Sequence, residues 1–141
     1  MTDAPTPAPS RSGPEAPTPP RPTILVVDDE AGVRIMVARM LSLSGYSVIS
    51  AQSGEEALSI VSDYAAPIDL VLTDVRMPEM TGPEMVVKLR ELRPGIRVMY
   101  MSAYSRDVLP DGAQDTDVPF LNKPFTMRTL ALSIVETLRR S

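Results

Sequence analysis

Short apolar runs, each bounded by turn-forming or polar residues, recur along the chain from Thr23 onward. They occupy residues 24–27, 46–50, 69–73, 96–101 and 118–121. Short runs of β-favouring residues between turn signals are typical of buried strands. The pattern therefore predicts five strands.

Amphipathic segments lie between most of these runs and predict helices. The second segment follows a capping-box pattern of Ser53 and Glu56, the third opens at a Gly-Pro pair, and the last follows a cap at Thr126. The positions at helical spacing that we expect to face the core are Val33, Met36, Val37, Met40, Leu41, Ala57, Ile60, Val61, Tyr64, Met85, Leu89, Leu92, Leu130, Ile134 and Leu138.

The stretch before the last predicted strand is different, because residues 104–117 contain Pro110, Gly112 and four aspartates with little apolar periodicity. We predict one short helix or an irregular loop there. Repeated strand–helix alternation implies parallel strands joined by right-handed crossovers, with helices on both faces of the sheet. The predicted fold class is therefore α/β: a flavodoxin-like, doubly wound (βα)5 sandwich with strand order 2-1-3-4-5, formed by residues 23–141.

Residues 1–22 contain eight of the fifteen prolines and almost nothing apolar. Such a segment cannot bury enough surface to fold, so we predict a disordered Pro-rich tail. Its two PxxP matches, at Pro17 and Pro19, could be ligands for a proline-binding domain, whereas the simpler interpretation is a solubilising tail.

The composition narrows the possible functions. The chain has no cysteine and no histidine, which excludes thiolate chemistry, a histidine base and a phosphohistidine of its own. A net charge of −4 argues against direct nucleic-acid binding. With no signal-peptide pattern and no apolar run near the ~20 residues that span a bilayer, we expect a cytoplasmic protein without membrane insertion.

Polar residues stand where four of the predicted strands end. Asp28 and Asp29 follow the first strand, Asp74 the third, Ser102 the fourth and Lys123 the fifth. Ligands of open parallel sheets bind outside the carboxyl ends of the strands, near the point where strand order reverses. We therefore expect these side chains to share one site.

The charges of that site favour a hard cation. Three carboxylates within a few ångströms repel one another unless their pKa values rise or a cation binds. Oxygen ligands without histidine or cysteine favour Mg²⁺ or Mn²⁺. With the cation and Lys123 stabilising a phosphoryl group and Ser102 donating a hydrogen bond, Asp74 is the expected nucleophile, forming an aspartyl phosphate.

Four segments in order resemble the receiver domains of two-component response regulators: ILVVDDE (24–30), LVLTDVRMPEMTG (70–82), MSAY (101–104) and FLNKPF (120–125). The resemblance covers about residues 23–140. Within it, MYMSAYS and FLNKPFT are similar to receivers appended to hybrid histidine kinases. The family's regular fourth helix is not matched by residues 104–117, so the usual output face next to it is in doubt.

The resemblance implies a role for each matching acidic residue. Asp74 matches the phosphoacceptor, Asp29 the direct metal ligand and Asp28 the residue that holds metal-bound water. The backbone carbonyl of Arg76 matches a further protein ligand of the metal. The implied metal set is therefore Asp28, Asp29, Asp74 and Arg76.

Residues on the last two strands receive roles in the same way. Ser102 matches the switch hydroxyl, Lys123 the phosphate-binding lysine and Phe120 the aromatic switch. Pro124 matches a proline that usually follows a cis peptide bond. The residues that flank the site are Ala103, Tyr104 and Pro124.

The resemblance implies a phosphoacceptor switch rather than an enzyme, although it would assist its own phosphorylation and its own slow dephosphorylation. Because the predicted fold uses the chain that follows the tail, we expect a stand-alone, single-domain regulator. A histidine kinase or histidine phosphotransfer protein would donate the phosphoryl group, and a downstream protein target would bind the changed surface. A homodimer formed on phosphorylation, a phosphate sink and a phosphorylation-independent interaction module stay open. A Mg²⁺-dependent phosphohydrolase is disfavoured, because Arg76 stands where a second acid is needed, and a nucleotide or flavin site lacks a Gly-rich loop.

Ordinary structural explanations exist for the same residues. Asp28 and Asp29 could cap the first helix, and Asp74 could be a turn residue. Lys123 and Ser102 could be plain loop and strand-end residues. Phe120 could belong only to the core, and Arg76 and Tyr104 could be surface side chains rather than groups that limit water access.

Overall fold

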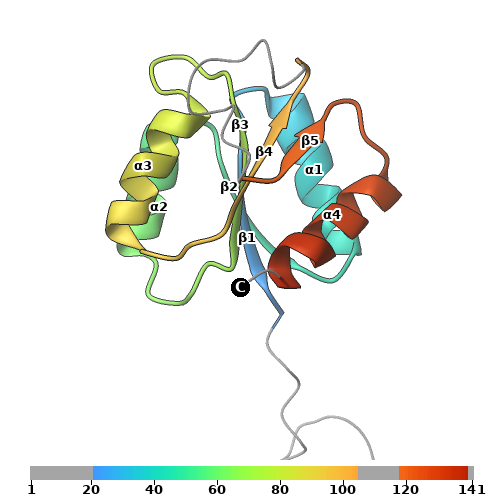
Figure 1. Cartoon of the computed structure of the whole chain (residues 1–141), viewed down its shortest axis with the longest axis horizontal. Helices are drawn as coiled ribbons and strands as arrows, with labels where there is room; N and C mark the ends of the chain where they lie inside the picture. Colours follow the sequence, from blue (N-terminus) through green and yellow to red (C-terminus); the bar gives the residue numbers. More distant parts are fainter. Residues whose placement is uncertain (1–20, 105–117, 140–141) are drawn as a thin grey trace, which may run out of the picture.

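The computed structural model describes residues 21–104 and 118–139, in which strands and helices alternate (Figure 1). The predicted strands are all found, with ends shifted by one or two residues at most. The strands are β1 (Thr23–Val27), β2 (Ser47–Ala51), β3 (Leu70–Asp74), β4 (Val98–Ser102) and β5 (Phe120–Asn122). The helices are α1 (Ala31–Leu43), α2 (Gly54–Asp63), α3 (Gly82–Leu92) and α4 (Met127–Arg139).

The sheet has the predicted order, β2-β1-β3-β4-β5, and all four neighbouring pairs are parallel. Helices α2 and α3 cover one face, and α1 and α4 cover the other (Figure 1). The order reverses between β1 and β3, which are neighbours in the middle of the sheet. The α/β prediction is therefore confirmed, and the carboxyl ends of all five strands meet at one edge.

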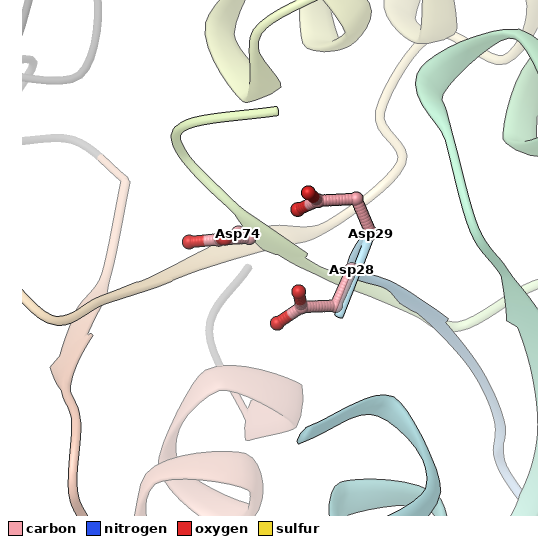
Figure 2. A group of neighbouring side chains, drawn as sticks. All are labelled: Asp28, Asp29 and Asp74. Atoms are coloured by element: carbon pink, nitrogen blue, oxygen red, sulfur yellow. The ribbon is translucent and has the colours of Figure 1, made fainter. Parts of the chain in front are cut away.

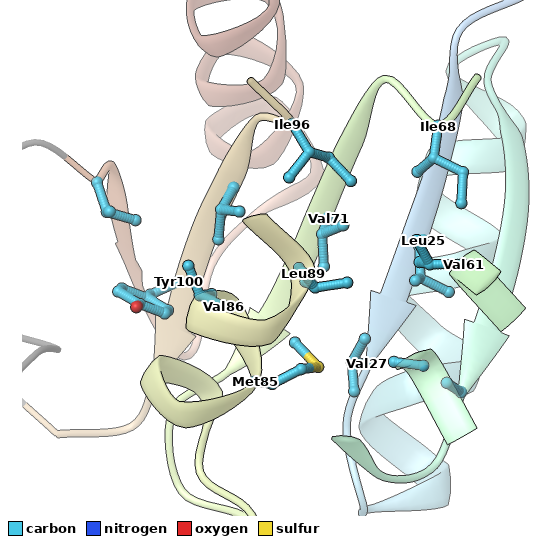
Figure 3. Close-up of a cluster of buried hydrophobic side chains, with 14 of the residues drawn as sticks. Leu25, Val27, Val61, Ile68, Val71, Met85, Val86, Leu89, Ile96 and Tyr100 are labelled. Atoms are coloured by element: carbon cyan, nitrogen blue, oxygen red, sulfur yellow. The ribbon is translucent and has the colours of Figure 1, made fainter. Parts of the chain in front are cut away.

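Two apolar clusters fill the space between the sheet and the helices. One cluster lies under α2 and α3 and contains Leu25, Val71, Met85, Leu89 and Tyr100 (Figure 3). The other lies under α1 and α4 and contains Ile24, Leu72, Leu41, Leu130 and Ile134. Successive strand residues alternate between the clusters, as strand geometry requires. Both faces of β1, β3 and β4 are buried, which explains their continuous apolar runs.

The predicted helical faces are correct except at two positions. Met36 is 44% exposed and Leu92 is 47% exposed, so the expectation that they face the core was wrong. Leu92 is the last residue of α3, where the helix has run past the edge of the core. Met36 precedes the buried Val37, and the helical turn directs its side chain away from the sheet.

The predicted cap of α2 at Ser53 is present, but one of its two expected hydrogen bonds goes to a different residue. Ser53 accepts a hydrogen bond from the Glu56 backbone N–H, but the Glu56 side chain accepts from Gln52 instead of Ser53. At α3, Thr81 and Glu84 form a complete capping box that we did not predict.

Some expectations fall where the structure gives no description. The predicted short helix or loop at 104–117 lies outside the described residues, apart from Tyr104. The predicted disordered tail lies outside them too, apart from its last two residues. Among the helices of the described ranges, none is long and apolar enough to cross a membrane.

Candidate functional site

Three carboxylates lie together at the carboxyl edge of the sheet (Figure 2). Asp28 and Asp29 directly follow β1, and Asp74 is the last residue of β3. Because β1 and β3 are neighbours, their ends bring these side chains within reach of one another. One carboxylate oxygen of each residue lies within 4.8 Å of the others, as the sequence predicted.

Asp28 is buried, and its carboxylate and both of its backbone polar groups form hydrogen bonds within the protein. Its carboxylate accepts hydrogen bonds from the Glu30 backbone N–H at 2.9 Å and from Lys123 Nζ at 3.0 Å. Its backbone N–H donates to the Ala51 carbonyl, and its own carbonyl accepts from Arg34. The N-cap of α1 is Glu30, without a side-chain cap, so Asp28 and Asp29 do not serve as the helix cap.

Lys123 follows β5 and links two of the carboxylates. Its Nζ lies 3.0 Å from Asp28 Oδ2 and 3.6 Å from Asp74 Oδ1, and its side chain is only 14% exposed. It is therefore a site residue and not a solvated loop lysine. The peptide bond between Lys123 and Pro124 is cis, as the resemblance implied.

Asp74 has an unusual pKa, raised from 3.8 to about 6. Burial is the main cause, since it disfavours the ionised form, and the nearby charges of Asp28 and Asp29 raise the pKa further. The ammonium of Lys123 and the hydrogen bond from the Val75 backbone N–H oppose this change. Three carboxylates and one ammonium leave the site with a formal charge of −2 when all are ionised.

The carboxylates fit a Mg²⁺ or Mn²⁺ ion. Mg²⁺ binds oxygens at about 2.1 Å, so opposite ligands of one ion lie about 4.2 Å apart. A separation within 4.8 Å needs only small side-chain movements to match that geometry. Asp29 is exposed, so a cation has access from solvent. The oxygen-only donor set and the negative charge both favour such a hard cation.

The loop that follows β3 is shaped by close backbone contacts. The Gly82 N–H donates to the Val75 carbonyl at 2.8 Å. A Cβ at Gly82 would lie 2.5 Å from the Asp74 carbonyl oxygen, closer than real Cβ atoms approach. Within the loop, Glu79 adopts a left-handed conformation with φ of 71°. Gly82 therefore allows α3 to begin directly beside the end of β3.

The remaining predicted residues surround the carboxylates. Ser102 is 1% exposed at the end of β4, and its Oγ accepts from the Tyr104 backbone N–H at 3.0 Å. The Arg76 guanidinium stacks on the Tyr104 ring, 4.6 Å from its centroid. Ala103 is exposed beside them. Phe120 is half-buried and packs against the cluster under α2 and α3. The switch roles of Ser102 and Phe120 and the ligand role of the Arg76 carbonyl stay predictions.

Two residues that shape the site, Arg34 and Gly82, were not identified from the sequence. Arg34 donates to the Asp28 carbonyl at 2.8 Å, and its position six residues after Asp28, on a predicted helix, was the available signal. Gly82 was recognised only as part of a helix start. The close approach of its backbone to Asp74 depends on the fold and has no local pattern.

Known proteins are similar to this chain in both sequence and fold. The family model "response regulator receiver domain" matches residues 24–135, so the chain belongs to the receiver domain family. The sensor kinase CckA of Brucella abortus is 39% identical over 119 residues, covering 84% of this chain and 13% of the kinase. The receiver protein CpdR of the same organism is 31% identical over 116 residues, covering 82% of this chain and 95% of CpdR.

Solved structures of receiver domains have the same fold as this chain. The receiver domain of the hybrid histidine kinase CckA has a TM-score of 0.70 at 38% identity, covering 83% of this chain and 99% of that domain. The response regulator TrrA of Thermotoga maritima, in complex with Mg²⁺ and BeF, has a TM-score of 0.69 at 30% identity, covering 82% of this chain and 98% of TrrA. The chain spans only 13% of the CckA kinase and 26% to 31% of several other relatives, so the activities of those whole proteins do not carry over.

Proposed function

We propose that Asp74 accepts a phosphoryl group and that the domain acts as a signalling switch in a phosphorelay. The observation that supports this most directly is the grouping of Asp28, Asp29 and Asp74 within 4.8 Å around a possible cation site, with Lys123 beside them. The donor would be a phosphohistidine on a histidine kinase or phosphotransfer protein, because this chain has no histidine. Membership of the receiver family supports the same donor class.

Each residue has a distinct part in the proposed transfer. An Asp74 oxygen forms the new bond to phosphorus while the bond from phosphorus to the histidine nitrogen breaks. The Lys123 ammonium, 3.6 Å from Asp74, is placed to stabilise the phosphoryl oxygens. Ser102 Oγ already accepts a hydrogen bond, so its own proton is available for donation to the phosphoryl group.

Asp28, Asp29 and Asp74, with the Arg76 carbonyl, would hold Mg²⁺. The bound ion would offset the charge between the carboxylate and the incoming phosphoryl group. The complex of TrrA with Mg²⁺ and BeF supports this cation.

The domain is proposed to be a phosphoacceptor and not an enzyme with turnover. Arg76, two residues after Asp74, offers no acid for rapid hydrolysis. Arg76 instead stacks on the Tyr104 ring, and we propose that this pair slows the access of water to the acceptor. Phosphorylation would then last long enough to change a surface that a downstream protein binds.

The test is intact mass measurement after incubation with acetyl phosphate and Mg²⁺. We expect the wild type to gain one phosphoryl mass of roughly 80 Da and Asp74→Asn to gain none, since the nucleophile is removed. Asp63→Asn is the matched control, because it removes the same charge from an exposed position on α2. Chelation of Mg²⁺ should abolish the gain in both the wild type and the control.

A folded, Mg²⁺-loaded protein that gains no mass from acetyl phosphate or from candidate kinases would contradict the proposal. The phosphorylation-independent interaction module would then be the better explanation. A partner that binds Asp74→Ala and the wild type equally would support that alternative.

A further inference from the structure

Arg34 reaches back from α1 to the loop that carries two of the carboxylates. Its Nη1 donates to the backbone carbonyl of Asp28 at 2.8 Å. That carbonyl belongs to the peptide group that joins Asp28 to Asp29. The contact therefore fixes the orientation of the peptide plane directly before the Asp29 side chain.

The other polar atoms of Asp28 are held as well. Its N–H continues the sheet by donating to Ala51 at 3.2 Å, and its two carboxylate oxygens accept from Glu30 and Lys123. With 0% exposure, Asp28 has no water to replace a lost partner. Among the described residues, Arg34 supplies the contact that fixes its carbonyl.

Asp29 is held differently. It is exposed, and within the described residues no hydrogen bond or ion pair restrains its carboxylate. The direction of this side chain therefore depends on the backbone that precedes it. Fixing that backbone before the cation arrives would favour a ligand role for Asp29, because the ligand is then already oriented.

We propose that Arg34 is a positioning residue for cation binding. Its hydrogen bond to the Asp28 carbonyl holds Asp29 where its carboxylate can join those of Asp28 and Asp74 around Mg²⁺. This inference rests on the Mg²⁺ binding included in the proposed function. The planar guanidinium suits the role, because it presents several donors in a fixed geometry.

The charge of Arg34 allows a decisive test, because charge and positioning predict opposite results. A cation this near the site repels Mg²⁺, so charge alone predicts tighter Mg²⁺ binding when Arg34 is neutralised. Positioning predicts weaker binding, since loss of a residue that orients a ligand typically weakens metal affinity by about tenfold or more.

The experiment is a Mg²⁺ titration of the full chain at constant ionic strength, followed by backbone amide NMR shifts. We expect about tenfold weaker binding for Arg34→Met, by the same reasoning on ligand orientation. Arg34→Lys, which keeps the charge and the ability to donate but lacks the planar guanidinium, should lie between Arg34→Met and the wild type. Arg39→Met is the matched control, because Arg39 is exposed on the same helix. The NMR spectrum also shows whether each variant is folded, and Arg34→Gln replaces Arg34→Met if that variant is not.

A second readout separates positioning from a general loss of stability. Mg²⁺ raises the melting temperature by linkage, and that increase should be smaller in Arg34→Met than in Arg39→Met. A contact that only stabilises the fold would lower the melting temperature equally with and without Mg²⁺.

Equal or tighter Mg²⁺ binding by Arg34→Met than by Arg39→Met would overturn the positioning role and leave the proposed function intact. A wild type that binds no Mg²⁺ would overturn both.

Discussion

Two loops supply the carboxylates of the site, and they are held in different ways. The β1–α1 loop (residues 28–30) is fixed by side chains from elsewhere, chiefly Lys123 and Arg34. The β3–α3 loop (residues 75–81) is fixed largely by its own backbone, through the bond from Gly82 to Val75 and the turn at Glu79. Contacts from charged side chains therefore hold the β1–α1 loop in place, whereas backbone hydrogen bonding and conformation hold the β3–α3 loop.

Because the two loops are held differently, substitutions in them should change stability in different ways. Substitutions that strain or relax the backbone at Glu79 or Gly82 should change the free energy of unfolding to a similar extent at different pH values and Mg²⁺ concentrations. Substitutions around the β1–α1 loop should have effects that depend on both, because they alter the charges that face the cation site.

The largest expected effect is that of Gly82→Ala. The new Cβ would lie 2.5 Å from the Asp74 carbonyl oxygen, and the atoms nearest to it are all backbone atoms of Asp74 and Val75, which cannot move aside as a flexible side chain could. We expect a loss of about 3 kcal/mol in the free energy of unfolding, as for severe overpacking. Urea denaturation measures it.

Gly32→Ala is the control for that measurement. Gly32 lies in α1, and a Cβ added there would have open space within 4 Å, so the change should leave stability equal or higher by up to about 1 kcal/mol. Similar losses for both variants would contradict the close-approach explanation.

Lys123→Met should have the next largest effect. It leaves the carboxylate of the fully buried Asp28 without its charged partner, which we expect to cost about 2 kcal/mol. Lys88→Met is the control, because Lys88 is the other lysine of the chain and is exposed on α3. Urea denaturation with and without Mg²⁺ compares them, and we expect Mg²⁺ to recover part of the loss. An equal loss in the two variants would show that Lys123 does not stabilise Asp28.

The raised pKa of Asp74 predicts an effect on stability that depends on pH. Because its folded pKa of about 6 lies above the usual 3.8, the folded state holds the proton more tightly than the unfolded state. This contribution to stability is fully present below pH 3.8 and is lost as the pH rises through about 6. Asp74→Asn carries no titrating group there, so its stability advantage over the wild type should grow as the pH rises through that window without Mg²⁺. Parallel curves for the two proteins would contradict the raised pKa.

Glu79→Asn should have the smallest effect. Glu79 adopts a φ of 71°, which L-residues tolerate poorly and asparagine tolerates better. We expect a gain of about 0.5 to 1 kcal/mol, measured by thermal denaturation. Glu79→Gln removes the same charge without easing the backbone, so a gain of equal size in that variant would point to charge instead.

The sequence was most informative where a feature is local or periodic. Apolar runs predicted the strands, and their alternation with helices predicted the doubly wound strand order. The polar residues that follow the strands predicted the cluster of Asp28, Asp29 and Asp74. Arg34 and Gly82 were not recognised as site residues, because their contacts depend on how α1 and α3 pack at the ends of the strands. Met36 was wrongly predicted to face the core, because the helical spacing of apolar residues does not show where the edge of the buried face lies.

The parallel sheet has a practical consequence for experiments on this protein. β1 begins at Thr23 at the opposite end of the sheet from Asp74, and α4 returns toward that same end (Figure 1). An affinity tag or biotin placed before Thr23 would therefore attach the molecule to a sensor chip with its carboxylate edge directed toward the flowing solution. Kinase binding could then be measured on the immobilised protein, because the attachment point would lie far from the Asp74 acceptor.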